Sequence, residues 1–405
     1  MTDVNIDTLE QDIIIVGGGM VGGVLAHALS RDGWRVTVLE RAPKGHSPSF
    51  DHRLTALSDA SWRYLDALDL IDEQAEHRAQ AICEVRVTDL GHFGMTRITM
   101  ANNGGIPLGR VMGNRALGDA IERGRPQAER NGAIHLMQPA QYVAHTVLES
   151  GTAGCVHVEV DYHGQVHTLN ARLLIAADGA GSTVRAASAV SVETQAYGQT
   201  AIVCTALPAR PHHGVAFECF TRGGPLAVLP APDGRVSVVW VNRDEDVTEL
   251  MTLSDEAFGE RLDRLFRHRL GGFSQLTPRH GYPLNLVTAQ DLIDDRLVIL
   301  GNAAHALHPV AGQGFNLCLR DVRDLTAHLR ADLGAAVDPG DPARLAAYAE
   351  QRSGDYRRTI GLTDRLVRGF SLDLPGLGIV RGAVLSAFDG LIPAKNRLVR
   401  LTRGL

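Results

Sequence analysis

The stretch DIIIVGGGMVGGVLAHALSRDGWRVTVLE, residues 12–40, limits the fold more than any other part of the sequence. Its apolar run, Ile13 to Val16, is typical of a strand that is buried on both faces of a parallel sheet. Glycines end that run, and small and apolar residues at helical spacing from Val21 to Arg31 predict a helix. Because Arg35 to Leu39 again fits a buried strand, the segment predicts a β-α-β unit.

The glycines of this unit match the pattern G-x-G-x-x-G at Gly17, Gly19 and Gly22. In such a unit the first glycine permits a tight turn, the second lets the backbone approach a pyrophosphate, and the third brings the helix onto the sheet. The helix N-terminus offers free N–H groups and a positive dipole end to the phosphates. Glu40 ends the second strand, where a carboxylate accepts hydrogen bonds from an adenosine ribose and repels a 2′-phosphate. We therefore expect a resident FAD or NAD, and not NADP.

A second buried run, Leu173 to Ala177, is followed directly by Asp178. Beyond that turn, Ser182 and Arg185 are spaced to reach polar atoms of a ligand. The whole segment, residues 173–185, predicts a strand that runs into a ligand-facing loop.

A third buried run, Arg296 to Leu300, leads into GNAAHALHPVAGQGFNL, residues 301–317, and then into a predicted helix from Phe315 to Leu329. Three distant segments of the chain thus have the same strand-to-loop pattern. An extended dinucleotide such as FAD requires several segments to converge on it. The three segments together indicate FAD.

The rest of the chain predicts a different kind of sheet. The spacing of apolar residues from Leu54 to Glu76 predicts helix, whereas short alternating runs between Thr200 and Asn242 predict an antiparallel sheet, and Ser254 to Leu270 predicts an amphipathic helix. The expected fold class is α/β: a Rossmann-like FAD-binding domain, interrupted by a mixed or antiparallel substrate domain and followed by a helical region. We expect FAD-binding parts at 1–82, 111–190 and 286–335, substrate-domain parts at 83–110 and 191–285, and a helical region at 336–405.

Composition narrows the class of partner. A formal charge of -6 gives no reason to expect nucleic acid as a partner. Residues 1–11 are polar and acidic, unlike a secretory signal, and the most apolar stretches are too short or too polar to span a bilayer. A cytoplasmic protein is expected. The cysteines lack the paired spacing of a zinc site or redox motif, which favours buried thiols; they are Cys83, Cys155, Cys204, Cys219 and Cys318.

His305 and His308 have a spacing that metal ligands can use. No third ligand with a metal pattern lies nearby, and Pro309 follows directly. We therefore expect no metal site, and interpret both histidines as structural or close to the flavin.

The three segments resemble the fingerprints of the FAD-dependent aromatic hydroxylases, the single-component flavoprotein monooxygenases related to 4-hydroxybenzoate hydroxylase. The resemblance covers essentially the whole chain. FDHRLTAL (50–57), NRAL (114–117), GPLAVLP (224–230) and above all HPVAGQGFNL (308–317) are similar to the ubiquinone-biosynthesis hydroxylases. The wider family has aspartate where this chain has Asn302, and the asparagine resembles the 2-octaprenyl-6-methoxyphenol hydroxylase subgroup.

The resemblance implies a resident FAD, NADPH or NADH as a transient co-substrate, and O2. It implies hydroxylation of a polyprenylated phenol, most closely 2-octaprenyl-6-methoxyphenol to the 1,4-benzoquinol, through a hydroperoxide at flavin C4a. Glu40 would hold the adenosine ribose, Arg53 and Arg115 would lie along the cofactor, and residue 302 would meet its ribityl or pyrophosphate part. The backbone N–H groups of residues 312–314 would face the pyrimidine edge of the flavin, which becomes anionic on reduction. The expected cofactor-binding set is Gly17, Gly19, Gly22, Glu40, Arg41, Arg53, Arg115, Asp178, Asn302, Pro309, Gly312, Gln313 and Gly314.

Several alternatives remain open at this point, and no catalytic base is assigned. The chain could hydroxylate another ring position in the same pathway, or it could be a flavin-dependent polyprenyl reductase that works without oxygen. A protein that holds FAD structurally within a biosynthetic complex is the non-enzymatic alternative.

The chain after Ile360 carries seven basic residues against three acidic ones. These residues fit contact with anionic lipid or with proteins of a ubiquinone-biosynthesis complex. A solvated helical face that packs on the core is an equally weighted explanation. The basic residues are Arg365, Arg368, Arg381, Lys395, Arg397, Arg400 and Arg403.

Overall fold

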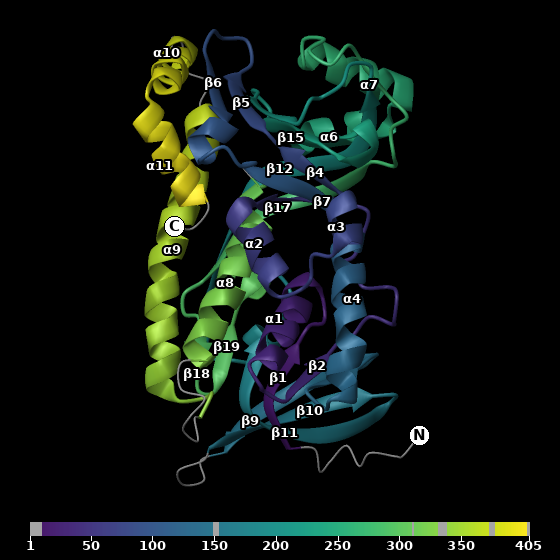
Figure 1. Cartoon of the computed structure of the whole chain (residues 1–405), viewed down its shortest axis with the longest axis vertical. Helices are drawn as coiled ribbons and strands as arrows, with labels where there is room; N and C mark the ends of the chain where they lie inside the picture. Colours follow the sequence, from purple (N-terminus) through teal and green to yellow (C-terminus); the bar gives the residue numbers. More distant parts are fainter. Residues whose placement is uncertain (1–9, 149–153, 310–311, 331–337, 372–376, 403–405) are drawn as a thin grey trace.

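The structure, a computed structural model, describes residues 10–148, 154–309, 312–330, 338–371 and 377–402. Residues 1–9, for which the sequence predicts no secretory signal, lie outside this part, as do Arg403 and the side chains of Arg365 and Arg368. Two sheets lie one above the other along the long axis, and the long helix α9 (Pro342–Ser371) runs beside the lower one (Figure 1). The predicted α/β class is confirmed.

The lower sheet contains the three segments that share the strand-to-loop pattern. Its strands follow the order β18-β19-β11-β1-β2-β8, and the hairpin β9-β10 pairs with β11. The pairs β19-β11, β11-β1, β1-β2 and β2-β8 are all parallel. The strands are β1 (Glu10–Val16), β2 (Val36–Leu39), β8 (Ile134–Met137), β9 (Ala140–Leu148), β10 (Cys155–Tyr162), β11 (Gln165–Ala176), β18 (Ile293–Asp294) and β19 (Leu297–Ile299).

The run Ile13 to Val16 is apolar throughout because both of its faces are covered. Ile13 and Ile15 belong to a buried cluster with side chains of the helices α1 (Met20–Arg31), α4 (Asn114–Arg130) and α8 (Gln313–Arg330). Ile14 and Val16 belong to a second buried cluster, with side chains of β9 and β10. The predicted β-α-β unit is therefore present, in the centre of the sheet.

The upper sheet follows the order β20-β17-β12-β15-β14-β13-β5-β6, with β16 paired to β12. All its pairs are antiparallel except β13-β5, which confirms the antiparallel character expected for residues 200–242. The helices α6 (Asp244–Thr252) and α7 (Asp255–Leu265) contribute Leu250, Phe258 and Leu262 to its core. The strands are β5 (Glu84–Asp89), β6 (Met95–Thr99), β12 (Val192–Pro208), β13 (Val215–Phe220), β14 (Pro225–Pro230), β15 (Val236–Arg243), β16 (Phe273–Ser274), β17 (His280–Ala289) and β20 (His305–Ala306).

A three-stranded sheet, β3-β7-β4, corrects the helix predicted from Leu54 to Glu76. Its first five residues form a strand because they pair antiparallel with residues 109–113. Helix begins only at Asp59, where Ser58 caps α2. The strands β7 and β17 also run across the domain boundaries expected after 110 and 285. The elements are β3 (Leu54–Ser58), α2 (Asp59–Ala67), α3 (Glu73–His77), β4 (Ala79–Ile82) and β7 (Gly109–Gly113).

The helices α10 (Leu377–Gly390) and α11 (Ile392–Thr402) cover β6, the edge strand of the upper sheet. The backbone N–H of Arg97 donates to Asp389 Oδ1 at 2.7 Å, and its carbonyl accepts from Lys395 Nζ at 3.1 Å. Covering an edge strand in this way blocks pairing with another chain. No helix in the described ranges is both long enough and apolar enough to cross a membrane.

Candidate dinucleotide site

Four parallel strands of the lower sheet end level with one another. Val16 is the register partner of Leu39 in β2 and of Ala176 in β11, and Ala176 is the partner of Ile299 in β19. The loops that follow these strands therefore leave the same edge of the sheet. In open parallel sheets, ligands bind at this carboxyl edge. The structure thus brings the three predicted segments together.

The first of these loops requires glycine at two positions. Gly17 has φ +107°, and a Cβ there would lie 2.4 Å from the carbonyl oxygen of Ala177 in the neighbouring loop. A Cβ at Gly22 would lie 1.8 Å from the oxygen of Gly17, so the helix could not lie as close to the turn. Gly19 is the N-cap of α1, with no side-chain capping bond and no acidic residue in the first turn. The N-terminus of α1 is therefore available to an anion.

Glu40 is buried and holds the first loop in place. Its Oε2 accepts from the backbone N–H of Gly18 at 2.8 Å, and its Oε1 accepts from that of Ala42 at 2.7 Å. Each carboxylate oxygen can accept a further bond. The neighbouring Arg41 is exposed.

In the second loop, Ser182 and Arg185 pack differently from the expectation. Oδ2 of Asp178 accepts from the backbone N–H of Thr183 at 2.8 Å, and Ser182 caps the short helix α5 (Thr183–Ala186). Arg185 is buried and donates to the carbonyl oxygens of Ala303 and Ala180. The expectation that Ser182 and Arg185 reach ligand atoms is therefore wrong. Both satisfy backbone groups, and Arg185 ties the second loop to the third.

The third loop places Asn302 beside Cys318, in the second turn of α8. Asn302 is exposed, and its Oδ1 lies 3.7 Å from the thiol sulfur of Cys318, which also donates to the carbonyl oxygen of Gly314 at 3.2 Å. Burial raises the pKa of the Cys318 thiol, so the sulfur stays protonated as a weak donor. A Cβ at Gly314 would meet nothing within 4 Å. The space next to the start of α8 is therefore open.

Asn316, to which the sequence assigned no role, joins α8 to β3. Its Nδ2 donates to the carbonyl oxygens of Ala56 at 2.9 Å and Gly312 at 2.6 Å, and its Oδ1 accepts from the N–H of Ser58 at 2.8 Å. Gly312 has φ +60°, a conformation that glycine adopts readily. The only sequence signal for Asn316 was its place in the string HPVAGQGFNL. Gln313 is buried at the start of the helix, and Pro309 is half-buried.

Arg53 and Arg115 come from neighbouring segments. The Arg53 guanidinium pairs with Asp51 and lies 4.8 Å from the ring centroid of Tyr282 in β17. Asn114 donates from Nδ2 to Asp51 Oδ1 at 3.1 Å, and its backbone N–H donates to the oxygen of Arg53 at 2.9 Å. Arg115 follows at the start of α4 and is exposed. Asn114 is a second residue that sequence reasoning missed.

His308 is buried and packs against the upper sheet. Its ring lies 5.1 Å from that of Tyr197 in an edge-to-face arrangement. Neither ring nitrogen has a hydrogen-bond partner among the residues that the structure describes. Burial lowers the pKa of His308 to about 4. The ring is therefore neutral at physiological pH.

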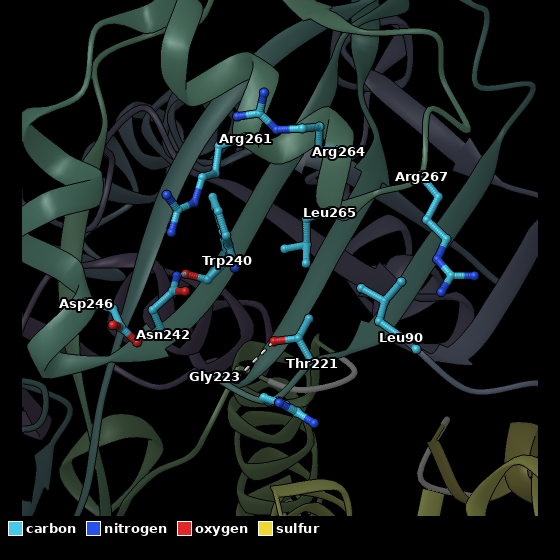
Figure 2. Close-up of a pocket in the computed structure, with 12 residues that line it drawn as sticks. Leu90, Thr221, Gly223, Trp240, Asn242, Asp246, Arg261, Arg264, Leu265 and Arg267 are labelled. Carbon is cyan, nitrogen blue, oxygen red and sulfur yellow. Dashed lines mark hydrogen bonds between the residues drawn. The ribbon is translucent and has the colours of Figure 1, made fainter. Parts of the chain in front are cut away.

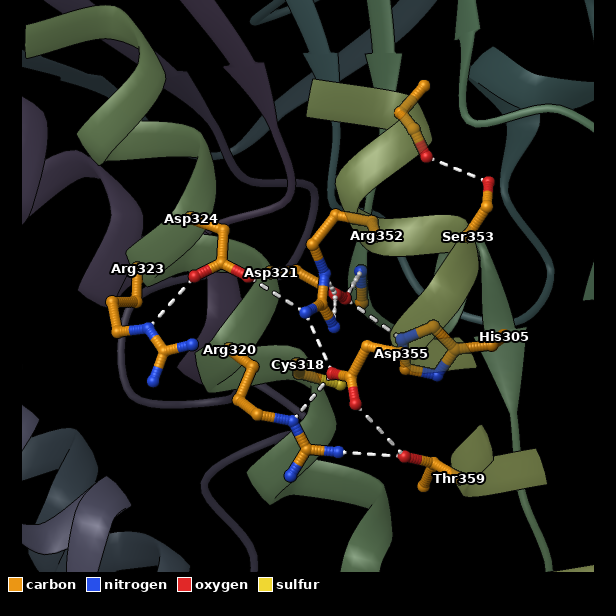
Figure 3. Close-up of polar contacts among 12 residues, drawn as sticks. His305, Cys318, Arg320, Asp321, Arg323, Asp324, Arg352, Ser353, Asp355 and Thr359 are labelled. Carbon is orange, nitrogen blue, oxygen red and sulfur yellow. Dashed lines mark hydrogen bonds and ion pairs between the residues drawn. The ribbon is translucent and has the colours of Figure 1, made fainter. Parts of the chain in front are cut away.

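His305 belongs to a buried polar network behind the third loop (Figure 3). Its Nε2 donates to Asp321 Oδ2 at 2.9 Å, and the same oxygen accepts from the backbone N–H of Gly301 at 3.1 Å. The other oxygen of Asp321 accepts from Arg352 Nε at 3.0 Å. Burial by itself would raise the pKa of Asp321, but the interactions with His305 and Arg352 outweigh it and hold that pKa below its usual value. The network fixes the loop that carries Asn302.

These features fit a long anionic ligand with hydroxyl groups. The N-terminus of α1 is uncapped, neither α1 nor α8 has an acidic residue in its first turn, and Gly314 leaves open space beside α8. Asn302 offers both a donor and an acceptor. Pyrophosphate, ribityl hydroxyls and an anionic ring edge therefore all have suitable partners among the residues present.

A separate cavity of about 560 Å³ lies in the upper sheet (Figure 2). Its lining comes from β15, α6, α7 and the loops after β5 and β13, and includes Trp240, Asn242, Asp246, Arg261 and Arg264. None of the cofactor-binding residues predicted from the sequence lines it. The dinucleotide site is therefore distinct from this cavity.

The comparisons with known proteins identify the family of the chain. A family model described as FAD binding domain matches residues 10–360. The ubiquinone hydroxylase UbiL of Rhodospirillum rubrum is 38% identical over 399 residues, covering 97% of this chain and 89% of that protein. The 3-demethoxyubiquinol 3-hydroxylase of Escherichia coli is 28% identical, covering 97% and 98%. The crystal structure of p-nitrophenol 4-monooxygenase PnpA of Pseudomonas putida has a TM-score of 0.78 at 18% identity, covering 97% and 98%, which shows the shared fold.

Proposed function

Since the chain belongs to the FAD binding domain family, we propose that it hydroxylates a polyprenylated phenol in ubiquinone biosynthesis. The protein is a FAD-dependent monooxygenase. One observation carries the proposal. The helices α1 and α8 both begin near the carboxyl edge of the parallel sheet, where α1 has an uncapped N-terminus and α8 has open space beside its first turn. A flavin dinucleotide needs partners at both of its ends, and this edge of the sheet supplies them.

The first and second loops would hold the adenosine half of the cofactor. Gly17, Gly19 and Gly22 would let the N-terminus of α1 face the pyrophosphate, where its N–H groups have no side-chain competitor. Glu40 already accepts hydrogen bonds from two backbone N–H groups. Its remaining lone pairs would accept a hydrogen bond from a ribose hydroxyl. Asp178 would contribute from the neighbouring loop, and Arg41 from the exposed start of the loop after β2.

The third loop and α8 would hold the flavin half. Asn302 would bind the ribityl chain, and the N–H groups of residues 312–314 would face the flavin pyrimidine edge. A helix N-terminus stabilises negative charge there. Pro309 would border the ring, and Arg53 and Arg115 would lie along the cofactor as positive groups.

When bound, FAD supplies electron transfer from NAD(P)H and activation of O2. The protein must hold the phenol ring close to the flavin and keep water out. We propose that Tyr197 on β12, His308 in the third loop and Tyr282 on β17 border this region, since His308 packs against Tyr197 and Tyr282 lies under Arg53. His308 as a neutral ring adds no charge that would draw in water. The overall reaction is NAD(P)H + H⁺ + O2 + Ar–H giving NAD(P)⁺ + H2O + Ar–OH.

We propose 2-octaprenyl-6-methoxyphenol as the substrate within this class, with the 1,4-benzoquinol as product. Two features support this choice: Asn302 resembles that subgroup, and the relative with 38% identity is named a ubiquinone hydroxylase. The same site would accept a phenol that is attacked at another ring position. Mass spectrometry of the quinone precursor that accumulates in cells without the protein separates these positions.

The direct test uses the purified holoprotein, NADPH or NADH, and a short-chain prenylated phenol under ¹⁸O2. A hydroxylase gives a product that carries one ¹⁸O atom, in an amount equal to the substrate-dependent consumption of oxygen. Product that forms equally well without oxygen would identify a reductase instead. Flavin that is not reduced by NADPH or NADH in the presence of the phenol would point to a scaffold.

A further inference from the structure

The outward side of α10 is apolar although it faces solvent. Six large apolar side chains on α10, at its junction with α11 and in the β5–β6 hairpin are between 55 and 62% exposed. Most of the strongly exposed large apolar side chains in the described part of the chain lie in this one region, at the end of the molecule where α10 meets the hairpin of β5 and β6 (Figure 1). We call this region the α10 surface; it comprises Phe93, Ile379, Val380, Val384, Leu391 and Ile392.

Three residues of the α10 surface share one side of α10. At about 100° per residue, Ile379, Val380 and Val384 point to the same side of α10, with the exposed Ala383 and Ala387 between them. An amphipathic helix normally turns its apolar stripe toward the protein core. Here the apolar stripe faces away from the core.

The opposite face of α10 is fixed on the hairpin, so the apolar face cannot rotate inward. A Cβ at Gly382 would lie 2.1 Å from the carbonyl oxygen of Phe93, and one at Gly94 would lie 2.2 Å from that of Gly382. Thr96 Oγ1 donates to the carbonyl oxygen of Leu385 at 2.7 Å. The contact is close and hydrogen-bonded.

Positive charge lies beside this apolar surface. Arg397 and Arg400 are exposed on α11, and neither forms an ion pair within the described part of the chain. The acidic residues next to the surface are already paired: Asp389 with Lys395 at 3.3 Å, and Asp89 with Arg381 at 2.8 Å. The region therefore combines an exposed apolar face with unpaired cations.

We propose that the α10 surface binds the surface of an anionic lipid bilayer. An apolar helix face with adjacent cations is the arrangement that inserts at the boundary between headgroups and acyl chains. A second copy of the chain fits less well, because a two-fold contact would bring the unpaired arginines of both copies into one interface without acidic partners. The proposal rests on these residues alone and does not depend on which substrate the enzyme uses.

The test is co-sedimentation of the full-length holoprotein with vesicles of phosphatidylcholine containing 30 mol% phosphatidylglycerol, and with vesicles of phosphatidylcholine alone. The double variant V380E/V384E places two charges on the α10 surface. The matched control V143E/V166E makes the same change at two exposed valines in β9 and β11, at the other end of the molecule. Bound FAD and circular dichroism check that each variant is folded.

The wild type should bind the anionic vesicles, and V380E/V384E should reduce its partition coefficient about tenfold or more, because two apolar contacts are replaced by charges. V143E/V166E should stay within about twofold of the wild type. R397Q/R400Q should remove most of the preference for phosphatidylglycerol, by roughly tenfold. Absence of wild-type binding, or equal losses in the two double valine variants, would overturn the proposal. So would a dimer in sedimentation velocity that V380E/V384E dissociates without any vesicle binding.

Discussion

His305 and Asp321 are joined by a hydrogen bond of 2.9 Å between Nε2 and Oδ2, and both side chains are fully buried. The same carboxylate binds Arg352 and the backbone N–H of Gly301. The side chain of Asp321 in α8 thus joins the third loop to the helix α9. The loop that carries Asn302 depends on this pair for its position.

Asp321→Asn should lower the free energy of unfolding by about 3 to 5 kcal/mol, because removing one partner of a buried ion pair leaves the others uncompensated. Urea denaturation of the apoprotein measures this loss. The control is Asp69→Asn, which breaks an exposed pair with Arg31 and should change stability by less than about 1 kcal/mol. Equal effects of the two variants would contradict the role given to the network.

Gly314→Ala should weaken FAD binding without destabilising the apoprotein. The new methyl group enters the open space beside α8, where we place the flavin, while alanine favours helix over glycine by about 1 kcal/mol. The ratio of flavin to protein absorbance and urea denaturation measure the two effects. Gly22→Ala is the contrasting variant, since its methyl group would lie 1.8 Å from a backbone oxygen and should impair both properties. Full flavin retention by Gly314→Ala would argue against a flavin next to α8.

Asn302→Asp should retain FAD, with an affinity change of about 1 kcal/mol, the scale of one hydrogen bond. The carboxylate still accepts a hydrogen bond from a ribityl hydroxyl, and the side chain is exposed, so its charge is not buried in the apoprotein. Asn302→Leu removes both donor and acceptor and should bind FAD more weakly than either. Flavin fluorescence titration measures the three affinities. Apoprotein on purification of Asn302→Asp would refute this prediction.

Arg53→Met should lower FAD affinity about tenfold or more, which is the scale of one charged hydrogen bond. The variant loses the guanidinium that pairs with Asp51 and lies over Tyr282. Arg63→Met is the control, because Arg63 also pairs with a nearby aspartate, Asp59, but lies in α2. A titration in which the two variants bind FAD equally would remove Arg53 from the site.

Stability should fall below pH 6.5 because of His308. Its pKa is about 4 in the folded protein and 6.5 in a model peptide. Between these values the unfolded chain binds a proton that the folded chain does not, so unfolding is favoured by about 1.4 kcal/mol for each pH unit below 6.5. His308→Phe keeps a ring against Tyr197 and should remove this part of the slope in urea denaturation between pH 7.5 and 5. An unchanged slope in His308→Phe would contradict this prediction.

The central elements of the lower sheet could be predicted from the sequence, because each buried strand is a continuous apolar run within a short segment. Each of its three key strands is an apolar run next to glycine or a polar turn. The strand β3 could not be predicted in the same way, since LTALS suits helix or strand and only its pairing with β7 decides. The strand β17 was missed because its residues are mostly not buried and its main partner strand, β12, lies about 80 to 100 positions away.

The site was predictable in outline, but its supporting contacts were not. Glycines and Glu40 follow from a pattern within one segment. Asn316 contacts a backbone 258 positions away, and Arg185 reaches a carbonyl oxygen 118 positions away. No local spacing reveals such partners, and for that reason Arg185 was wrongly expected to face the ligand.

The strands β1, β11 and β19 end at the same edge of the sheet but are far apart in the sequence, so they are synthesised at different times. The ribosome makes Glu40 early and Asn302 only 262 residues later, which takes roughly 13 to 50 s at about 5 to 20 residues per second. During that interval the nascent chain has the phosphate-facing loop but lacks the strand that completes the other half of the site. Capture of a flavin that is held by both halves of the proposed site would therefore wait until the third strand leaves the ribosome.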